Sequence, residues 1–215
     1  MTNIQIDIVS DIACPWCAIG YARLERAMTQ LEAEHEFTVN WHAFELNPTQ
    51  SGQGEPILPA LARKYGRSED EMREAQGNMM SIAKELGINF EKLQERRTAN
   101  TFDAHRLVKW AAEQGQQTAM KQALFEAYFG RALDVSDHEV LLDCVKTVGL
   151  DVTAAGKVLA SDQFADDVRE DEATYQRAGV NSVPAFIINQ KYLISGAQDP
   201  DVLVKAFQDI SAEAA

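Results

Sequence analysis

Cysteine, long apolar runs and positive charge are all scarce in this sequence. It contains three cysteines, and an odd number cannot form a fully paired set of structural disulfides. No stretch approaches the ~20 consecutive apolar residues that a membrane-spanning helix needs. Lysine and arginine total 20 against 33 aspartates and glutamates, a formal net charge of −13. A field of that sign opposes phosphate backbones, so we expect neither a nucleic acid nor a membrane as partner.

The strongest candidate for a nucleic-acid site is the basic segment at residues 92–97. Glu91 and Glu95 lie among its basic residues, so the local charge is mixed. Mixed charge at this spacing is typical of the solvated face of a helix. We therefore predict an exposed helical face here and no phosphate-binding site.

The first ten residues have no basic segment, and Asp7 interrupts their short apolar run. They therefore lack the layout of a secretory signal. We expect the protein to be cytoplasmic, in a compartment where disulfides are usually transient and catalytic.

The composition is that of an ordinary globular protein, with 46% apolar and 25% charged residues over 215 positions. Alternating isoleucines predict a strand over residues 4–9. A helix is predicted over residues 15–34, because Pro15 suits the first helical turn, where a missing N–H costs nothing. Alternating apolar residues over 37–44 predict a second strand, which completes a β-α-β unit.

The middle of the chain has helical periodicity and follows a polar loop at residues 47–59. The predicted helices cover residues 69–86, 101–114, 118–130, 137–148 and 160–178. Few residues in this region alternate as a strand would require. The middle of the chain is therefore predicted to be all-helical.

Strand patterns return at residues 184–188 and 191–194, and a last helix begins at Asp199 or Pro200. The order β-α-β, helices, β-β-α separates two halves of one small sheet in the sequence. The class is therefore α/β with a long helical insertion. The predicted boundaries are 1–47 with 179–215 for the domain that carries the sheet, and 48–178 for the inserted helical domain.

Cys14-Pro15-Trp16-Cys17 lies where the first predicted strand leads into the first predicted helix. Two cysteines at this spacing on a first turn can close a small disulfide. Cys17 continues the apolar stripe of the helix, whereas Cys14 lies at the amino end, where unpaired N–H groups favour an anion. Thiolates in such motifs have pKa values lowered to ~3.5–7.5. The pattern predicts a partly exposed Cys14 nucleophile and a buried Cys17 resolving thiol.

The alternative for this cysteine pair is a structural zinc site, which needs four ligands. The remaining candidate ligands are Cys144, His35, His42, His105 and His138. No two of them have ligand-like spacing, so the pattern favours redox chemistry and predicts no metal.

Five motifs distributed over nearly the whole chain are distinctive as a set. They are SDIACPWC at residues 10–17, FELNP at 44–48, NTFDAHRL at 100–107, LFEAYF at 124–129 and GVNSVPAF at 179–186. Together they resemble the DsbA-like thioredoxin family, in its cytoplasmic FrnE-type branch. The resemblance implies a thioredoxin fold with an all-helical insertion and the activity of a thiol–disulfide oxidoreductase.

The resemblance also implies roles for residues around the cysteine pair. Thioredoxin-like folds place a cis proline just before the third strand, so Pro184 is expected to be cis and to face Cys14 and Cys17. The implied substrate contacts are Pro15, Trp16, Val183 and Pro184. The implied partner is a protein or small molecule that carries a thiol or disulfide. No cofactor is implied beyond the redox-active pair; glutathione is a candidate co-substrate, and a homodimer is a form that relatives often adopt.

The same branch of folds includes glutathione-dependent relatives, the kappa-class transferases and the 2-hydroxychromene-2-carboxylate isomerases. In those proteins a serine typically replaces the first cysteine, so the two sulfurs kept here favour dithiol chemistry. Trp16 stands where strongly oxidising DsbA proteins have histidine, and Ile8 where thioredoxins carry a buried acid. A second cysteine pair, found in some FrnE-type proteins, is absent. A binding module or chaperone that uses neither cysteine is a third alternative.

Four other polar residues are weighed between structural and functional roles. Cys144 lies on an apolar helical stripe and is predicted to be a buried apolar residue. A satisfied core position is favoured for His105 over a proton donor, although the family motif includes it. Asp11 could accept backbone N–H bonds in the Cys14 turn, where its charge would oppose the thiolate. The role of Asn100 stays open.

Overall fold

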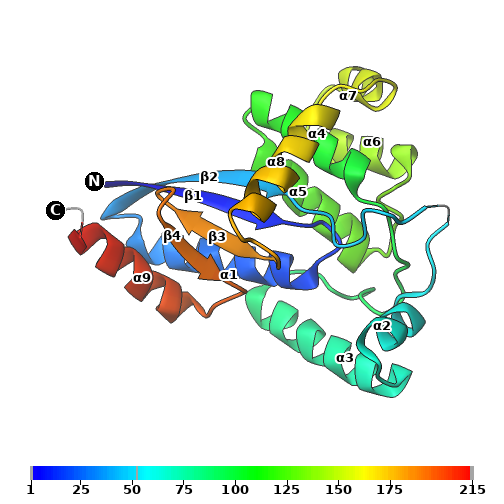
Figure 1. The fold of residues 1–215 in the computed structure, drawn as a ribbon, viewed down its shortest axis with the longest axis horizontal. Coiled ribbons are helices and arrows are strands. Elements are labelled where there is room, and N and C mark those ends of the chain that lie inside the picture. The colour runs from blue at the N-terminus through cyan, green and yellow to red at the C-terminus, as the bar shows by residue number, and fades with distance from the viewer. Residues whose placement is uncertain (1, 52, 214–215) are drawn as a thin grey trace.

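The computed structural model describes residues 2–51 and 53–213, in which a sheet carries helices on both faces (Figure 1). The strands are β1 (Thr2–Ser10), β2 (His35–Ala43), β3 (Ala185–Ile188) and β4 (Tyr192–Ser195). They are arranged in the order β2-β1-β3-β4. β1 pairs parallel with β2 and antiparallel with β3, and β3 pairs antiparallel with β4. The predicted mixed sheet, built from two distant parts of the chain, is confirmed.

Helices separate the two pairs of strands and flank the sheet. They are α1 (Pro15–Leu31), α2 (Ile57–Tyr65), α3 (Glu69–Leu86), α4 (Phe102–Glu113), α5 (Gln117–Phe125), the π-helical turn η1 (Glu126–Gly130), α6 (His138–Thr147), α7 (Val152–Leu159), α8 (Ala165–Arg177) and α9 (Pro200–Glu213). Among the residues that the structure describes, no helix is long and apolar enough to cross a bilayer.

The alternation of side chains along β2 assigns helices to the two faces of the sheet. On one face, Trp41 packs against Tyr21 of α1, with ring centroids 4.9 Å apart. On the opposite face, the neighbouring His42 lies 4.7 Å from the ring centroid of Tyr175 in α8. Figure 1 shows α1 and α9 together on one side of the sheet and α8 crossing the other. The sheet is therefore the middle layer of three.

The helical region differs from its prediction between residues 150 and 178. One helix was predicted over residues 160–178, whereas the chain forms α7, a break, and α8. Asp151 starts α7 by accepting the N–H of Thr153 at 2.8 Å. Phe164 has a φ of 61°, a left-handed conformation that no α-helix continues through, so α8 begins at the next residue.

Two further differences concern shorter segments. Helix α2 begins inside the predicted loop over residues 47–59. The helix predicted over 118–130 ends as an α-helix at Phe125 and continues as the wider turn η1.

The hydrophobic core is continuous from the sheet into the helical region. Ile6 and Ile8 of β1, Leu24 of α1 and Met120 and Leu124 of α5 are all fully buried members of one cluster. Both sulfurs of the predicted redox pair belong to the same cluster. That residues 48–178 form a separate inserted domain stays a prediction.

Candidate active site

The predicted redox pair lies at the junction of β1 and α1. The Cys14 N–H donates to the Asp11 carbonyl at 3.2 Å, which closes the turn after β1. Cys14 is the N-cap of α1, with an extended backbone, and Pro15 is the first helical residue. The Cys17 N–H donates to the Cys14 carbonyl at 3.0 Å. Both sulfurs therefore belong to the first turn of the helix, where the sequence places them.

Burial of the two thiols differs in part from the prediction. Cys17 is fully buried, as expected, but Cys14 is only 5% exposed, so the prediction that it is partly exposed was wrong. Its Sγ lies 3.7 Å from the carbonyl oxygen of Val183, which precedes the cis proline Pro184. The segment before β3 therefore covers the sulfur. Trp16 is 36% exposed beside it, and the predicted cis bond is confirmed.

The two thiols have opposite pKa shifts. The hydrogen bond that the Cys17 thiol donates lowers the pKa of Cys14, and the backbone N–H groups of Cys17 and Trp16 act in the same direction. Burial and the Asp11 carboxylate oppose this lowering without reversing it. Burial raises the pKa of Cys17 well above its ordinary value, and its interaction with Cys14 raises it further. The favoured state is a thiolate at Cys14 beside a neutral thiol at Cys17.

Asp11 is 1% exposed and organises the turn that leads to Cys14. Its Oδ1 accepts the N–H of Ala13 at 3.3 Å, and its Oδ2 accepts the N–H of Leu46, beyond β2, at 2.8 Å. The predicted backbone bonds are thus present, and its charge does oppose the Cys14 thiolate. Asp11 therefore joins the turn before Cys14 to the segment after β2, although its negative charge disfavours the Cys14 thiolate.

His105 of α4 contacts this aspartate from the helical region. Its Nε2 lies 3.3 Å from Asp11 Oδ1 and 3.2 Å from the Phe44 carbonyl oxygen. Because both neighbours are acceptors, Nε2 carries the hydrogen. Burial lowers the pKa of His105, with the charge of Lys121 acting in the same direction. The geometry agrees with the favoured interpretation, a satisfied core histidine.

Lys121 of α5 is a buried cation that the sequence analysis missed. Its side chain is fully buried, with Nζ 5.4 Å from the ring centroid of Trp41 and 5.6 Å from that of Phe125. Burial lowers the pKa of Lys121 to about 8, while Cys17 raises it. A signal was present, because Lys121 is in helical phase with the apolar residues Leu124 and Phe125.

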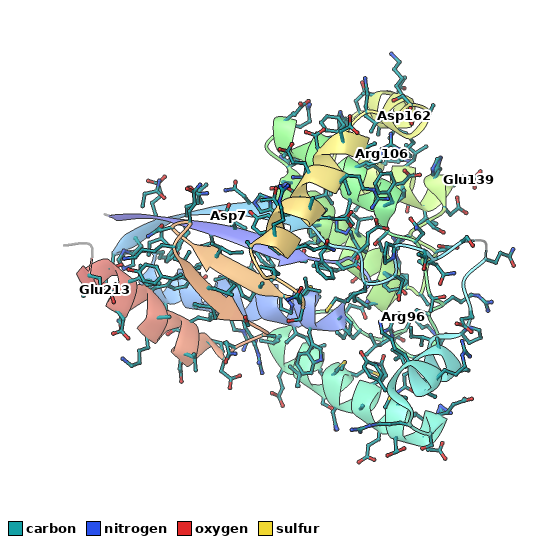
Figure 2. The ribbon with its side chains drawn as sticks, in the orientation of Figure 1. Asp7, Arg96, Arg106, Glu139, Asp162 and Glu213 are labelled. Carbon is teal, nitrogen blue, oxygen red and sulfur yellow. The ribbon has the colours of Figure 1, made fainter. Side chains whose placement is uncertain are left out.

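Arg96 is a second missed cation and corrects the prediction for residues 92–97. It is 2% exposed and donates to Gln76 Oε1 at 2.8 Å and to the Leu93 carbonyl. Its guanidinium lies 5.6 and 5.4 Å from the ring centroids of Tyr128 and Phe129. These rings receive the side chain in the core, so the segment is a series of turns and not an exposed helical face. Figure 2 shows Arg96 on the side of the molecule where α1 begins. Burial lowers the pKa of Arg96, and Tyr128 and, to a smaller extent, Cys14 oppose this lowering.

Cys144 and Asn100, also named from the sequence, each have a hydrogen-bond partner of their own. Cys144 of α6 is 1% exposed, and its thiol donates to the Ala123 carbonyl at 3.8 Å. This burial agrees with the prediction that Cys144 is a buried apolar residue. Asn100 precedes α4, where its Oδ1 accepts the Phe102 N–H at 2.9 Å. Within residues 2–51 and 53–213, no three His, Cys, Asp or Glu side chains are grouped as a metal site would require.

A cavity of about 310 Å³ lies along α1 beyond the cysteine pair. Ala18, Tyr21 and Ala22 of α1 form one wall, and Phe90 and Phe125 are among the residues that form the others. Ala18 is one helical turn from Cys14, so the cavity begins close to the site. Its walls are mostly apolar.

Comparison with known protein families identifies one model that covers almost the entire chain. The model describes a DSBA-like thioredoxin domain and matches residues 5–208. The family resemblance of the five motifs is therefore confirmed.

Two further proteins are similar over nearly their full length. The uncharacterized protein YwbO of Bacillus subtilis is 28% identical over 211 residues, which are 96% of this chain and 97% of that protein. The crystal structure of a probable DsbA oxidoreductase, SCO1869 from Streptomyces coelicolor, superposes with a TM-score of 0.91 at 33% identity. The match covers 98% of this chain and 91% of that chain.

A more distant structure is that of a 2-hydroxychromene-2-carboxylate isomerase. It superposes with a TM-score of 0.72 at 14% identity and covers 98% of this chain and 96% of its own. At that identity the likeness concerns the fold alone.

Proposed function

Because the chain belongs to the family of DsbA-like thioredoxin domains, and is therefore an enzyme of the thiol–disulfide kind, we propose that it exchanges disulfides through Cys14 and Cys17. One observation supports this above the others: two thiols on one helical turn have pKa shifts of opposite sign. A dithiol enzyme needs this asymmetry, since one sulfur must be a thiolate for attack while the other waits as a thiol.

In the reductive direction, the Cys14 thiolate attacks one sulfur of a substrate disulfide. A mixed disulfide forms on Cys14, and the other substrate sulfur leaves as a thiolate and takes a proton from solvent. Cys17 then loses its proton and attacks Cys14 Sγ, which forms the Cys14–Cys17 disulfide and releases the second substrate thiolate. Two electrons pass from the pair to the substrate, and the reverse sequence oxidises a dithiol.

The proposed substrate contacts follow Cys14 in sequence or belong to the pair Val183–Pro184, whose Val183 carbonyl oxygen lies 3.7 Å from the Cys14 sulfur. They are Pro15, Trp16, Val183 and Pro184. Trp16 offers an exposed aromatic surface beside the pair, and the Val183 carbonyl can accept an N–H from an extended substrate segment. Because Cys14 is only 5% exposed, an extended segment reaches it more readily than a folded surface does.

The remaining parts of the proposal come from the family resemblance. We place the protein in the FrnE-type branch and in the cytoplasm, acting on a thiol or disulfide of a protein or a small molecule. The redox pair itself takes the place of a cofactor, with glutathione as a candidate co-substrate and a homodimer as a candidate assembly.

Reduction of insulin by dithiothreitol tests the proposal in wild type, Cys14→Ser and Cys17→Ser. We expect the wild type to accelerate the reaction and both variants to fall to the uncatalysed rate. Cys17→Ser should also accumulate a mixed disulfide on Cys14 that mass spectrometry detects, because nothing resolves it. Cys144→Ala is the matched control, since that thiol is buried elsewhere, and should retain wild-type activity.

The same variants separate this function from a glutathione transferase or isomerase. That chemistry uses the thiol of glutathione and does not require Cys17. Glutathione conjugation that survives Cys17→Ser, together with failure of wild type to form a Cys14–Cys17 disulfide, would contradict the proposal.

A further inference from the structure

The cavity along α1 has an apolar floor and a polar rim. Buried residues with apolar side chains form the floor, among them Ala18, Ala22, Phe90 and Phe125. The polar side chains that line it are all exposed, and they are Glu25, Asn89, Gln122 and Glu126. Its volume of about 310 Å³ is about twice the ~150 Å³ of a cavity that binds benzene. The floor therefore has room for one large apolar side chain.

The rim of the cavity carries charge of one sign. Glu25 of α1 and Glu126 of η1 both lie there, and no lysine, arginine or histidine is among the described residues that line the cavity. Asn89 Nδ2 donates to Glu126 Oε1 at 2.9 Å and holds this carboxylate in place. Gly130 leaves room for the pair, because a Cβ there would lie 2.7 Å from both Asn89 Nδ2 and Glu126 Oε1. The rim therefore favours a cation and disfavours an anion.

The cavity and Pro184 lie on opposite sides of α1. Ala18 and Ala22 are one turn apart on the same face of the helix. Gly20 is turned about 200° away from both, and a Cβ on it would lie 3.1 Å from Pro184 Cγ. Cys14 caps the amino end of α1, which the two sides share. A substrate segment beside Pro184, with its sulfur at Cys14, can therefore continue over the first turn of α1 into the cavity.

We propose that this cavity binds an apolar side chain of a protein substrate and that its rim binds an adjacent basic side chain. The proposal rests on the dithiol function proposed above and names its substrate class, extended segments with an apolar and a basic residue near the reacting cysteine. Tyr21, in the middle of the cavity wall, is seven positions from Cys14, a rise of ~10 Å along the helix. An extended chain covers that distance in about three residues. The apolar residue is therefore expected about three or four positions from the substrate cysteine.

A neighbouring hollow offers the rest of the substrate a path but no preference for charge. It has a volume of about 350 Å³ and shares Ile88, Asn89 and Phe90 with the cavity. Lys84 and Glu91 both line it, so its charge is mixed. The preference for a basic residue is therefore assigned to the rim of the first cavity alone.

Reduction of short synthetic peptides by the full chain tests the proposal. Each peptide has one cysteine in a disulfide with methanethiol and, about four positions away, a variable pair of residues. The pair is leucine–lysine, alanine–lysine or leucine–glutamate, and each peptide is made with the pair before or after the cysteine. Reduced protein forms its Cys14–Cys17 disulfide and releases the peptide thiol and methanethiol. Chromatography of the peptide thiol, with peptide in excess, gives a second-order rate constant.

The wild type should prefer the leucine–lysine peptide in at least one orientation. We expect its rate constant to exceed that of the alanine–lysine peptide by about tenfold, because the cavity removes the larger side chain from water. It should exceed that of the leucine–glutamate peptide by about threefold at low ionic strength. The second difference should vanish at about 1 M salt, where the screening length is about 3 Å.

Filling the cavity should remove the preference for leucine. Ala22→Leu places a larger side chain in the floor and should reduce the leucine and alanine peptides at equal rates. Its rate with the alanine–lysine peptide should remain that of wild type. Ile88→Phe fills the cavity from the opposite wall and provides the same test if Ala22→Leu does not fold.

Neutralising the rim should remove the preference for lysine. Glu25→Gln combined with Glu126→Gln should reduce the lysine and glutamate peptides at equal rates, and a glutamine at position 126 can still accept the Asn89 N–H. Glu32→Gln combined with Glu113→Gln changes the net charge equally, at exposed acids that do not line the cavity. This control should keep the preference of wild type.

Several outcomes contradict the cavity proposal alone. They are equal rates of wild type with the leucine and alanine peptides, a preference for leucine that persists in both filled variants, and a preference for lysine that persists without the two rim carboxylates. A dimer of wild type in sedimentation that Ala22→Leu dissociates would show that a second copy of the chain occupies the cavity, and would also overturn the proposal. Failure of wild type to reduce any peptide would contradict the dithiol function itself, and this role with it.

Discussion

The sheet region and the helical region between β2 and β3 contribute different properties to the same pair of sulfurs. β1, α1 and the segment before β3 supply the thiols and the Val183 carbonyl, so they fix positions. The helical region supplies Arg96, His105 and Lys121, three ionisable side chains that are almost completely buried. The sheet region therefore fixes the geometry and also supplies Asp11 and the first-turn N–H groups that act on the sulfurs, and the helical region adds buried ionisable groups around them.

This division has a practical consequence for variants. A substitution in the helical region can change protonation and stability while the sulfurs stay in place. A substitution where α1 meets the segment before β3 moves the sulfurs themselves. Four substitutions test whether the two regions can be separated in this way.

The largest effect is expected for Arg96→Met, which removes a buried cation with bonded partners. Gln76 Oε1 and the Leu93 carbonyl lose their donor, and the aromatic faces of η1 lose the guanidinium. We expect the free energy of unfolding to fall by about 3 kcal/mol, measured by urea denaturation. Arg131→Met, at an exposed arginine, should change it by less than about 0.5 kcal/mol. Equal effects of the two would show that Arg96 does not organise the helical region.

Lys121→Met should change the free energy of unfolding in the opposite direction and raise it. The pKa of Lys121 falls from 10.5 to about 8 on folding, so the unfolded chain binds the proton more tightly. The penalty is complete below pH 8 and disappears as the pH rises to 10.5. We expect Lys121→Met to be more stable than wild type by on the order of 2 kcal/mol at pH 7.

The pH series supplies the control for this variant. Its advantage over wild type should shrink between pH 8 and 10.5, the interval in which the lysine loses its proton. A constant advantage at all pH values would assign the gain to packing and not to charge.

Glu45→Gln tests a buried charge that does have a partner. Burial raises the pKa of Glu45 to about 7, and Arg169, at 2.6 Å from Oε1, opposes the shift. A carboxyl whose pKa is raised on folding destabilises the protein above that pKa and not below the unfolded value of 4.5. We expect Glu45→Gln to gain about 1 kcal/mol at pH 8 and nothing at pH 4.5, by urea denaturation at each pH. A loss at pH 8 would mean that the bond to Arg169 outweighs the burial.

Gly20→Ala should likewise give only a small change in stability, since two effects partly cancel. A Cβ at Gly20 would lie 3.1 Å from Pro184 Cγ and 3.2 Å from the Phe186 ring, closer than ordinary contact. The gain of about 1 kcal/mol in helix propensity offsets part of that strain, and we expect a net loss of about 1 kcal/mol. Gly77→Ala, in an open part of α3, should instead gain up to about 1 kcal/mol.

The activity of Gly20→Ala completes the comparison. Because the added methyl presses on Pro184, the rate of insulin reduction should fall while its pH dependence stays that of wild type. A shifted pH profile would show that position and electrostatics are not separable.

Local patterns were sufficient to predict most of the strands and helices and the place of the cysteine pair. The stripe that contains Cys17, and Pro15 at the first turn, depend only on neighbours within one helix. Burial of Cys14 depends on Val183, 169 positions away, and no pattern near the cysteines contains that contact. The core position of Arg96 likewise depends on contacts with the rings of Tyr128 and Phe129. Both rings belong to η1, where the winding changes from α-helical to π-helical after α5.

That change of winding links the two buried cations mechanically. Phe125, at the end of α5, is the platform for Lys121, and Phe129, within η1, is the platform for Arg96. The two rings stack with centroids 5.9 Å apart and planes 23° from parallel. Removing one residue from η1 would restore ordinary α-helical winding and rotate everything beyond it by about 100°. The winding of this helix thus sets where the Phe129 platform of Arg96 meets the Phe125 platform of Lys121, and a length change of one residue in η1 would separate the two rings.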